Sequence, residues 1–229
     1  MRFPNAFTGV KKLFTSAVLT IISTIAAIIT IAAGFTTGVA AAEGSGTGAL
    51  ASLGIAAIMG IATAVLALIA FILNITGAKK ASADEPLFKN ALIAIFISFV
   101  ASVVGGFFSS NKTVSGITST VNSICSFLIM YYIITAIISL SGKLGNTDMQ
   151  NKGKSAIRIL TISYILDIIL EIVSNFILKS DAVLVIAGVL GIVALVFTIV
   201  ITIIYMSYLS KAKYMLISAT APADVPPIQ

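Results

Sequence analysis

The sequence predicts an all-α protein, a polytopic transmembrane bundle of six helices. Hydrophobic residues make up 59% of the chain and charged residues only 10%, whereas charged residues make up about 25% of a typical soluble domain. The apolar residues gather in six runs, each with at least the roughly 20 residues that a helix needs to cross a bilayer. Because these runs are continuous rather than alternating, the strands of a membrane barrel are disfavoured.

The six predicted spans follow one another through short connections. They lie at about 13–35, 50–74, 89–109, 119–141, 157–178 and 183–209. No connection is long enough to fold as a separate soluble domain. The chain therefore divides into an N-terminal segment 1–12, a transmembrane domain 13–210 and a cytoplasmic tail 211–229, whose prolines predict disorder at its end.

The segment 1–12 leads into the first span with aromatic residues at helical spacing. Phe3, Phe7 and Phe14 recur beside two lysines, which suits a short helix lying in the membrane interface; an irregular start is the alternative. The first span ends near an alanine-rich stretch, 39–43, that resembles a signal-peptide cleavage site. Because its apolar run of about 20 residues exceeds the 7 to 15 of a signal peptide, we expect a retained helix, with cleavage as the alternative.

Stripes of small residues run along the second and third predicted helices at intervals of four. Helices in lipid associate through close packing and interhelical hydrogen bonds, which favours small side chains at their contacts. We therefore expect these two helices to be neighbours within one chain; a dimerisation surface is the alternative. The stripes are Ser52, Ala56, Gly60 and Ala64 on the second helix and Ala94, Ser98, Ser102 and Gly106 on the third.

Short motifs mark the starts of the third and fifth helices. Asp84 and Glu85 precede Pro86, and acids and proline are both favoured at the start of a helix. Thr147 and Gln150 have the spacing of a capping box, which predicts a fifth helix that begins before the membrane.

The even-numbered helices end in similar stretches at 74–79, 139–144 and 208–213. Each stretch combines small or polar residues with lysine. The similarity is compatible with three tandem helical hairpins, and a chance resemblance is the alternative.

The basic residues predict how the bundle sits in the membrane. Of the 14 lysine and arginine residues, all except Lys112 and Lys179 lie in or beside the terminal segments and the connections after the second and fourth helices. The positive-inside rule places these segments in the cytoplasm, so we expect a multi-pass protein of the cytoplasmic membrane with both termini inside. The anionic lipids of the inner leaflet are the expected partners of these charges, and nucleic acid is not needed to explain them.

The fifth helix carries two carboxylates, Asp167 and Glu171, in an otherwise apolar run. They are four residues apart and therefore share a helix face, which Tyr164 and Asn175 extend. A central acid costs roughly 2.5 to 3.5 kcal/mol on the insertion scale, so this face should point to the bundle, a hydrated cavity or a partner rather than to lipid. Two carboxylates this close should not both be charged unless a cation joins them.

The acidic face supports cation- or proton-coupled transport of a small solute, with Asp167 and Glu171 as the coupling residues. In one alternative the acids only fix the helix register through hydrogen bonds to hydroxyls of the first, fourth and sixth helices. In another the protein is a non-catalytic scaffold or subunit that docks a partner helix carrying an intramembrane lysine or arginine. The candidate hydroxyls are Ser16, Thr20, Thr24, Ser123, Ser126, Thr135, Thr198 and Thr202.

Several classes of chemistry lack their residues in this chain. It has no histidine and a single cysteine, Cys125, which excludes histidine-based triads and metal sites and an internal disulfide. Protease motifs, phosphate-binding loops and dinucleotide fingerprints are also absent from the sequence. We therefore expect no enzymatic activity, no metal and no cofactor.

Overall fold

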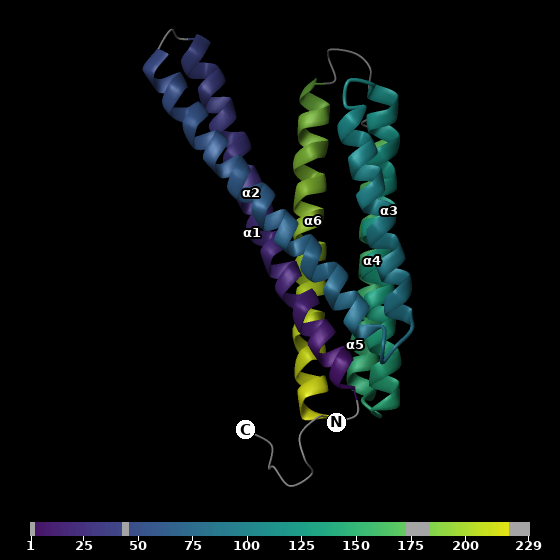
Figure 1. The fold of residues 1–229 in the computed structure, drawn as a ribbon. Helices are drawn as coiled ribbons and strands as arrows, with labels where there is room; N and C mark the ends of the chain where they lie inside the picture. Colours follow the sequence, from purple (N-terminus) through teal and green to yellow (C-terminus); the bar gives the residue numbers. More distant parts are fainter. Residues whose placement is uncertain (1–2, 43–45, 173–183, 220–229) are drawn as a thin grey trace.

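The computed structural model describes residues 3–42, 46–172 and 184–219, and the regular structure in them is entirely helical (Figure 1). The helices occur in the predicted order. They are α1 (Pro4–Ala42), α2 (Gly46–Ala81), α3 (Leu87–Phe107), α4 (Lys112–Lys143), α5 (Thr147–Ile172) and α6 (Leu184–Ser218). The all-α class is therefore confirmed for the described residues.

Four of the helices contain segments that are long and apolar enough to cross a membrane. These segments are Pro4–Thr30, Ala57–Ala81, Leu87–Phe107 and Thr113–Lys143. They correspond to the first four predicted spans and support an integral membrane protein. That α5 and α6 also cross the membrane stays a prediction, and part of each predicted span lies outside the described residues.

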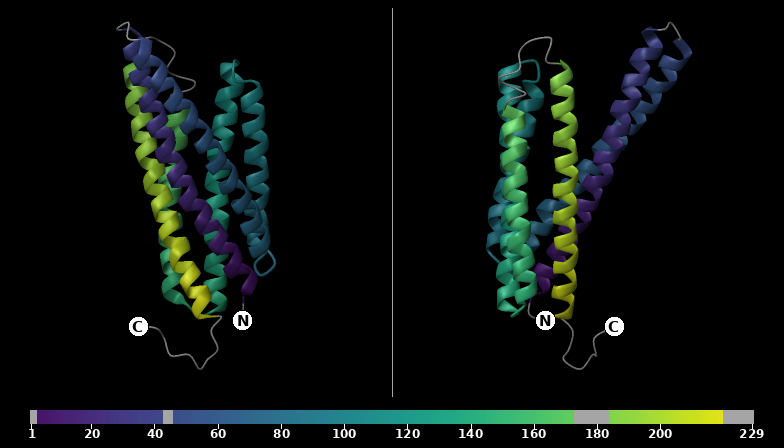
Figure 2. Two further views of the ribbon diagram at one scale, coloured as in Figure 1. Left: turned by 60° about the vertical axis from the view of Figure 1, so that its left-hand side comes forward. Right: turned by 180° about the vertical axis from the view of Figure 1, so that it is seen from behind.

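The helices pack as sequential neighbours. α1 packs along α2, α3 along α4, and α5 against both α4 and α6, while α6 also contacts α1. The start of α1 and the end of α6 lie at the same end of the bundle, called here the basal end (Figure 1). Toward the opposite, distal end the α1/α2 hairpin leans away from the other helices (Figure 2). The α1/α2 hairpin is therefore in close contact with the other four helices mainly in the basal half.

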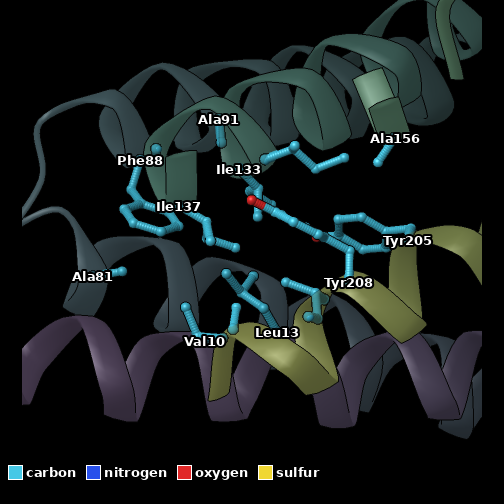
Figure 3. Packing of buried hydrophobic residues seen from close by; sticks show 14 of the residues in the cluster. Val10, Leu13, Ala81, Phe88, Ala91, Ile133, Ile137, Ala156, Tyr205 and Tyr208 are labelled. Atoms are coloured by element: carbon cyan, nitrogen blue, oxygen red, sulfur yellow. The ribbon is translucent and has the colours of Figure 1, made fainter. Parts of the chain in front are cut away.

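The buried core lies in that basal half and receives side chains from every described helix (Figure 3). Val10 and Leu13 of α1, Phe88 of α3, and Ile133 and Ile137 of α4 are completely buried. Branched and aromatic side chains from facing helices fill this space, and such close packing is what holds helices together in lipid. The core thus holds the six helices together at one end.

A glycine pair brings α1 and α2 into close contact near the basal end. A Cβ added at Gly9 would lie 2.5 Å from the carbonyl oxygen of Gly77 and 2.6 Å from Cβ of Ala81. Only glycine leaves room for a neighbouring backbone at this distance. Farther along the hairpin, the buried Ser16 hydroxyl donates to the carbonyl oxygen of Ala70 at 2.8 Å. The Gly9–Gly77 contact was not predicted from the sequence.

The two predicted small-residue stripes do not face one another in the described residues. Gly60 and Ala64 of α2 are exposed, and a Cβ added at Gly60 would meet nothing within 4 Å. On α3, the Ser98 hydroxyl donates to Oδ1 of Asn122 in α4 at 2.9 Å. Asn122 Nδ2 in turn donates to Oγ of Ser102 at 3.1 Å. The α3 stripe therefore lies against α4, because asparagine supplies the hydrogen bonds that lipid cannot.

The two ends of the α3 stripe have different surroundings. Ala94 is buried, whereas a Cβ added at Gly106 would meet nothing within 4 Å. The side chains of Ser52 and Ala56 lie outside the described part of the chain. α2 and α3 are neighbours, but they meet through the stacked rings of Phe71 and Phe99, whose centroids are 5.1 Å apart.

Residues 4–12 belong to α1 and do not form a separate interfacial helix. Ala6 and Val10 are completely buried, and the aromatic side chains of Phe3 and Phe7 pack against the core. Asp84 accepts a hydrogen bond from the backbone nitrogen of Ala6 at 2.7 Å. This carboxylate satisfies an amide that the first turn of α1 leaves without an intrahelical acceptor, so it caps α1 rather than α3.

Glu85 also stabilises a different helix from the one that its position suggested. α3 has no side-chain cap. Instead, Glu85 is buried, and its Oε2 accepts hydrogen bonds from Lys143 Nζ at 2.7 Å and from Ser139 Oγ at 2.9 Å. Lys143 and Ser139 belong to the last turns of α4, so Glu85 joins the α2–α3 connection to the basal end of α4.

Two helix boundaries differ in detail from the prediction. α5 begins at Thr147 as expected, but Oδ1 of Asn146 accepts from the backbone nitrogen of Met149 at 2.9 Å. The cap is therefore Asn146 rather than Thr147. α6 continues to Ser218, so 211–218 of the predicted tail are helical.

Candidate functional site

Asp167 lies on the face of α5 that is buried against the bundle. Leu160, Ser163 and Tyr164 are 1%, 7% and 8% exposed, and Asp167 itself is half-buried. At 3.6 residues per turn, Asp167 lies within about 60° of all three around the helix axis. The outward face of the same helix is apolar and exposed, as Ile162 and Ile165 show. The carboxylate therefore extends the inward face, in agreement with the cost of placing an acid in lipid.

Tyr164 connects this face to α4. Its hydroxyl donates to the sulfur of Met130 at 3.7 Å, and its ring packs against that of Phe127 with centroids 5.5 Å apart. Because Tyr164 is only three residues before Asp167, the acid lies about one turn distal to this contact with α4.

The rest of the predicted acidic stripe is less completely defined. Glu171 belongs to α5, one turn beyond Asp167, but its side chain lies outside the described residues, as does Asn175. The pairing of the two carboxylates stays a prediction. The nearest described basic residue on α5 is Arg158, nine residues earlier in the sequence and about 13 Å away along the axis.

A cavity of about 470 Å³ lies between the α1/α2 hairpin and the α3/α4 hairpin. Hydroxyl and amide side chains from four helices line it, together with apolar residues that include Phe71, Phe99 and Ile129. No charged side chain lines the described wall of this cavity. Its polar residues are Thr20, Ser23 and Thr24 of α1, Asn74 of α2, Ser98 and Ser102 of α3, and Ser126 of α4.

The cavity occupies the middle of the helices rather than their ends. Thr20 and Ser126 lie roughly 25 Å along their helices from the basal end, and Asn74 lies roughly 10 Å from it, at 1.5 Å per residue. If these helices span a membrane, the polar groups are at the depth of the hydrocarbon core. Hydrogen-bonding groups at this depth can bind water or a polar ligand beside the apolar part of the wall.

The polar groups of the cavity differ in whether the protein satisfies them. Thr20 and Thr24 donate to carbonyl oxygens one turn earlier in α1, at 3.0 and 2.9 Å, and Ser98 donates to Asn122. Asn74 and Ser126 make no side-chain hydrogen bond within the part of the chain that the structure describes. Asn74 offers both donors and an acceptor, and Ser126 offers one donor and an acceptor. These two side chains are the groups most available to a polar ligand.

α4 separates the cavity from the acidic face of α5. Ser126 lines the cavity, whereas its neighbour Phe127 and, one turn later, Met130 contact Tyr164 on an adjoining part of the α4 surface. The two polar regions therefore lie at a similar level of the bundle and share one helix. A shift of α4 would change both of them.

The cavity was not predicted as a site. Thr20, Thr24 and Ser126 were predicted only as hydrogen-bond partners for the acids, but the structure places them around the cavity with Asn74 and Ser98. The signal available in the sequence was the recurrence of polar side chains within the apolar runs of the first four helices. Which of their faces meet is decided by tertiary packing.

Comparison of the chain with protein-family models, with curated proteins and with solved structures gave no match.

Proposed function

We propose that the protein is a membrane transporter for a small, uncharged polar solute, coupled to protons or monovalent cations. The observation that carries this proposal is the mid-helix cavity of about 470 Å³ with hydroxyl and amide groups from four helices. Its volume lies in the usual range of small-molecule sites, about 300–1,000 Å³. Such a lining favours a ligand that exchanges hydrogen bonds without carrying charge.

Asp167, with Glu171 one turn beyond, is the coupling site in this proposal. A carboxylate on an inward helix face at membrane depth is a standard position for proton or cation binding. Its link to the cavity is α4, since Tyr164 contacts Met130 and Phe127 while Ser126 lines the cavity. Binding a cation changes the charge beside this contact, which gives α4 two states of different stability.

The proposed orientation places the basal end in the cytoplasm of a cytoplasmic-membrane protein. Lysines gather there at the ends of several helices, among them Lys79, Lys143 and Lys211. The positive-inside rule supports this orientation, and the same charges would contact the anionic lipids of the inner leaflet.

Labelling with a hydrophobic carbodiimide tests the coupling role without knowledge of the solute. Carbodiimides react with protonated carboxyl groups, so Asp167 in the reconstituted protein should be modified at low pH, less at high pH, and less again when sodium is added at constant ionic strength. Peptide mass spectrometry measures the modification. Glu85, which is buried and paired with Lys143, is the internal control, and sodium should not change its modification.

Modification of Asp167 that ignores both pH and sodium would contradict the coupling role. It would favour a structural role for the acid in helix register. Complete protection of Asp167 by a copurifying protein with an intramembrane basic residue would favour the scaffold alternative instead.

A further inference from the structure

A second groove, of about 480 Å³, lies between α5 and α6 close to the basal end. Its polar wall contains Lys152 and Ser155 of α5 and Ser207 and Lys211 of α6. Its apolar wall contains isoleucines from the same two helices. The groove belongs neither to the cavity between the hairpins nor to the acidic face of α5.

The polar and apolar residues of this groove separate by depth. Along α5, Ile159 lies seven residues distal to Lys152, and along α6, Ile204 lies seven residues distal to Lys211. Seven residues correspond to about 10 Å along a helix. Because α5 and α6 run in opposite directions, the two lysines lie at one level and the isoleucines at a deeper level. This separation by depth matches a phospholipid, whose charged headgroup lies at the membrane surface and whose acyl chains lie deeper.

The charge of the polar wall favours an anionic headgroup. Lys211 is exposed and has no carboxylate partner in the described part of the chain. Lys152 pairs with Asp148, which lies one turn nearer the basal end and is itself largely exposed, so this pair is weak. Tyr208 completes the wall, and its buried hydroxyl has no hydrogen-bond partner among the described residues.

We infer that this groove binds a phospholipid with an anionic headgroup. The phosphate lies between Lys152 and Lys211, where Ser155 and Ser207 offer hydroxyl donors, and an acyl chain follows Ile159 and Ile204 into the membrane. Basic pockets between helices at the cytoplasmic side commonly hold such headgroups. The inference depends on this groove alone and stands or falls independently of the transport proposal.

Native mass spectrometry of the full-length protein with added phosphatidylglycerol or phosphatidylcholine tests the site. The protein should bind phosphatidylglycerol more tightly, and the double variant Lys152→Gln/Lys211→Gln should lose about thirtyfold in that affinity, at about 1 kcal/mol per lysine. The matched control is Lys80→Gln/Lys154→Gln, which removes two exposed lysines outside the groove and should keep the preference. The variant Lys152→Arg/Lys211→Arg should also keep it.

Three results would overturn the inference. Equal losses in the groove variant and the control would show only a diffuse attraction of anionic lipid to the basal end. Equal affinity of the unmodified protein for both lipids would exclude selection by charge. Competition by inorganic phosphate at the concentration of the lipid would assign the lysines to a free phosphate ion.

Discussion

The Gly9→Ala variant is expected to lose about 3 kcal/mol of stability, the upper end of the usual cost of overpacking. The new methyl group would lie 2.5 Å from the carbonyl oxygen of Gly77 and 2.8 Å from the backbone nitrogen of Ala81. Both are backbone atoms of a neighbouring helix and cannot rotate away, so the α1/α2 hairpin must separate. Release of Cys125 to a thiol-reactive dye during heating measures the loss, because this cysteine is the chain's only one and is 4% exposed when folded.

Two glycines of α2 provide a graded comparison for this variant. Gly77→Ala should cost less, because its nearest contacts are at 3.0 to 3.2 Å and include the side chains of Leu13 and Lys12. Gly60→Ala should be neutral or stabilise by about 0.5–1 kcal/mol, because its methyl group meets nothing within 4 Å and alanine favours the helix. Equal melting temperatures for the Gly9 and Gly60 variants would show that the helices do not meet at Gly9.

The Glu85→Gln variant is expected to lose about 1.5–3 kcal/mol, the usual worth of hydrogen bonds to a charged group. Glu85 is 5% exposed and accepts from both Lys143 and Ser139. The Lys143 side chain is 47% exposed and can reach water once the pair is broken, so the loss should stay below the 3–5 kcal/mol of a fully buried pair. The same dye measurement follows the change.

Asp148→Asn is the matched control for Glu85. Asp148 pairs with Lys152 one turn away on α5, but both side chains are exposed. Such a pair contributes only about 0.3–0.5 kcal/mol, so this variant should melt near the unmodified protein. If the Glu85 variant had the same melting temperature as this control, Glu85 would not stabilise the contact between the α2–α3 connection and α4.

The helices themselves could be predicted because lipid solvation makes apolar run length informative. Runs of about 20 apolar residues marked the first four spans, and their positions agree with the structure. The helix ends were harder, since 4–12 and 211–218 are polar enough to suggest surface segments but pack as parts of α1 and α6. Their burial depends on the other helices and leaves no mark in the local sequence.

The contacts between helices could not be predicted from small residues alone. Gly60 and Ser98 both belong to stripes with a spacing of four residues. A Cβ added at Gly60 would meet nothing within 4 Å, whereas Ser98 donates a hydrogen bond to Asn122. Gly9 lies outside any stripe but contacts a second backbone. Asp84 and Glu85 have the position of helix-capping residues, yet each binds a helix distant in the sequence. In each case the partner, rather than the local pattern, decides the role.

The candidate site was predicted in part for the same reason. Burial of the α5 face around Asp167 follows from the cost of an acid in lipid, which the sequence alone reveals. The cavity depends on how two hairpins diverge, and no single helix carries that information. Tyr164, which the sequence placed on the acidic face, contacts α4 beside the residue that lines the cavity.

Cysteine accessibility in intact membranes tests the central claim, that the cavity is a hydrated polar site within the membrane. In a Cys125→Ala background, the Ser126→Cys variant should react rapidly with a charged methanethiosulfonate, because water in the cavity allows the thiol to ionise. The Ile124→Cys variant lies two residues away on the same helix and is 42% exposed on the outer surface, where lipid should keep its thiol unreactive. Equal resistance of both variants, or faster reaction at position 124, would contradict the claim.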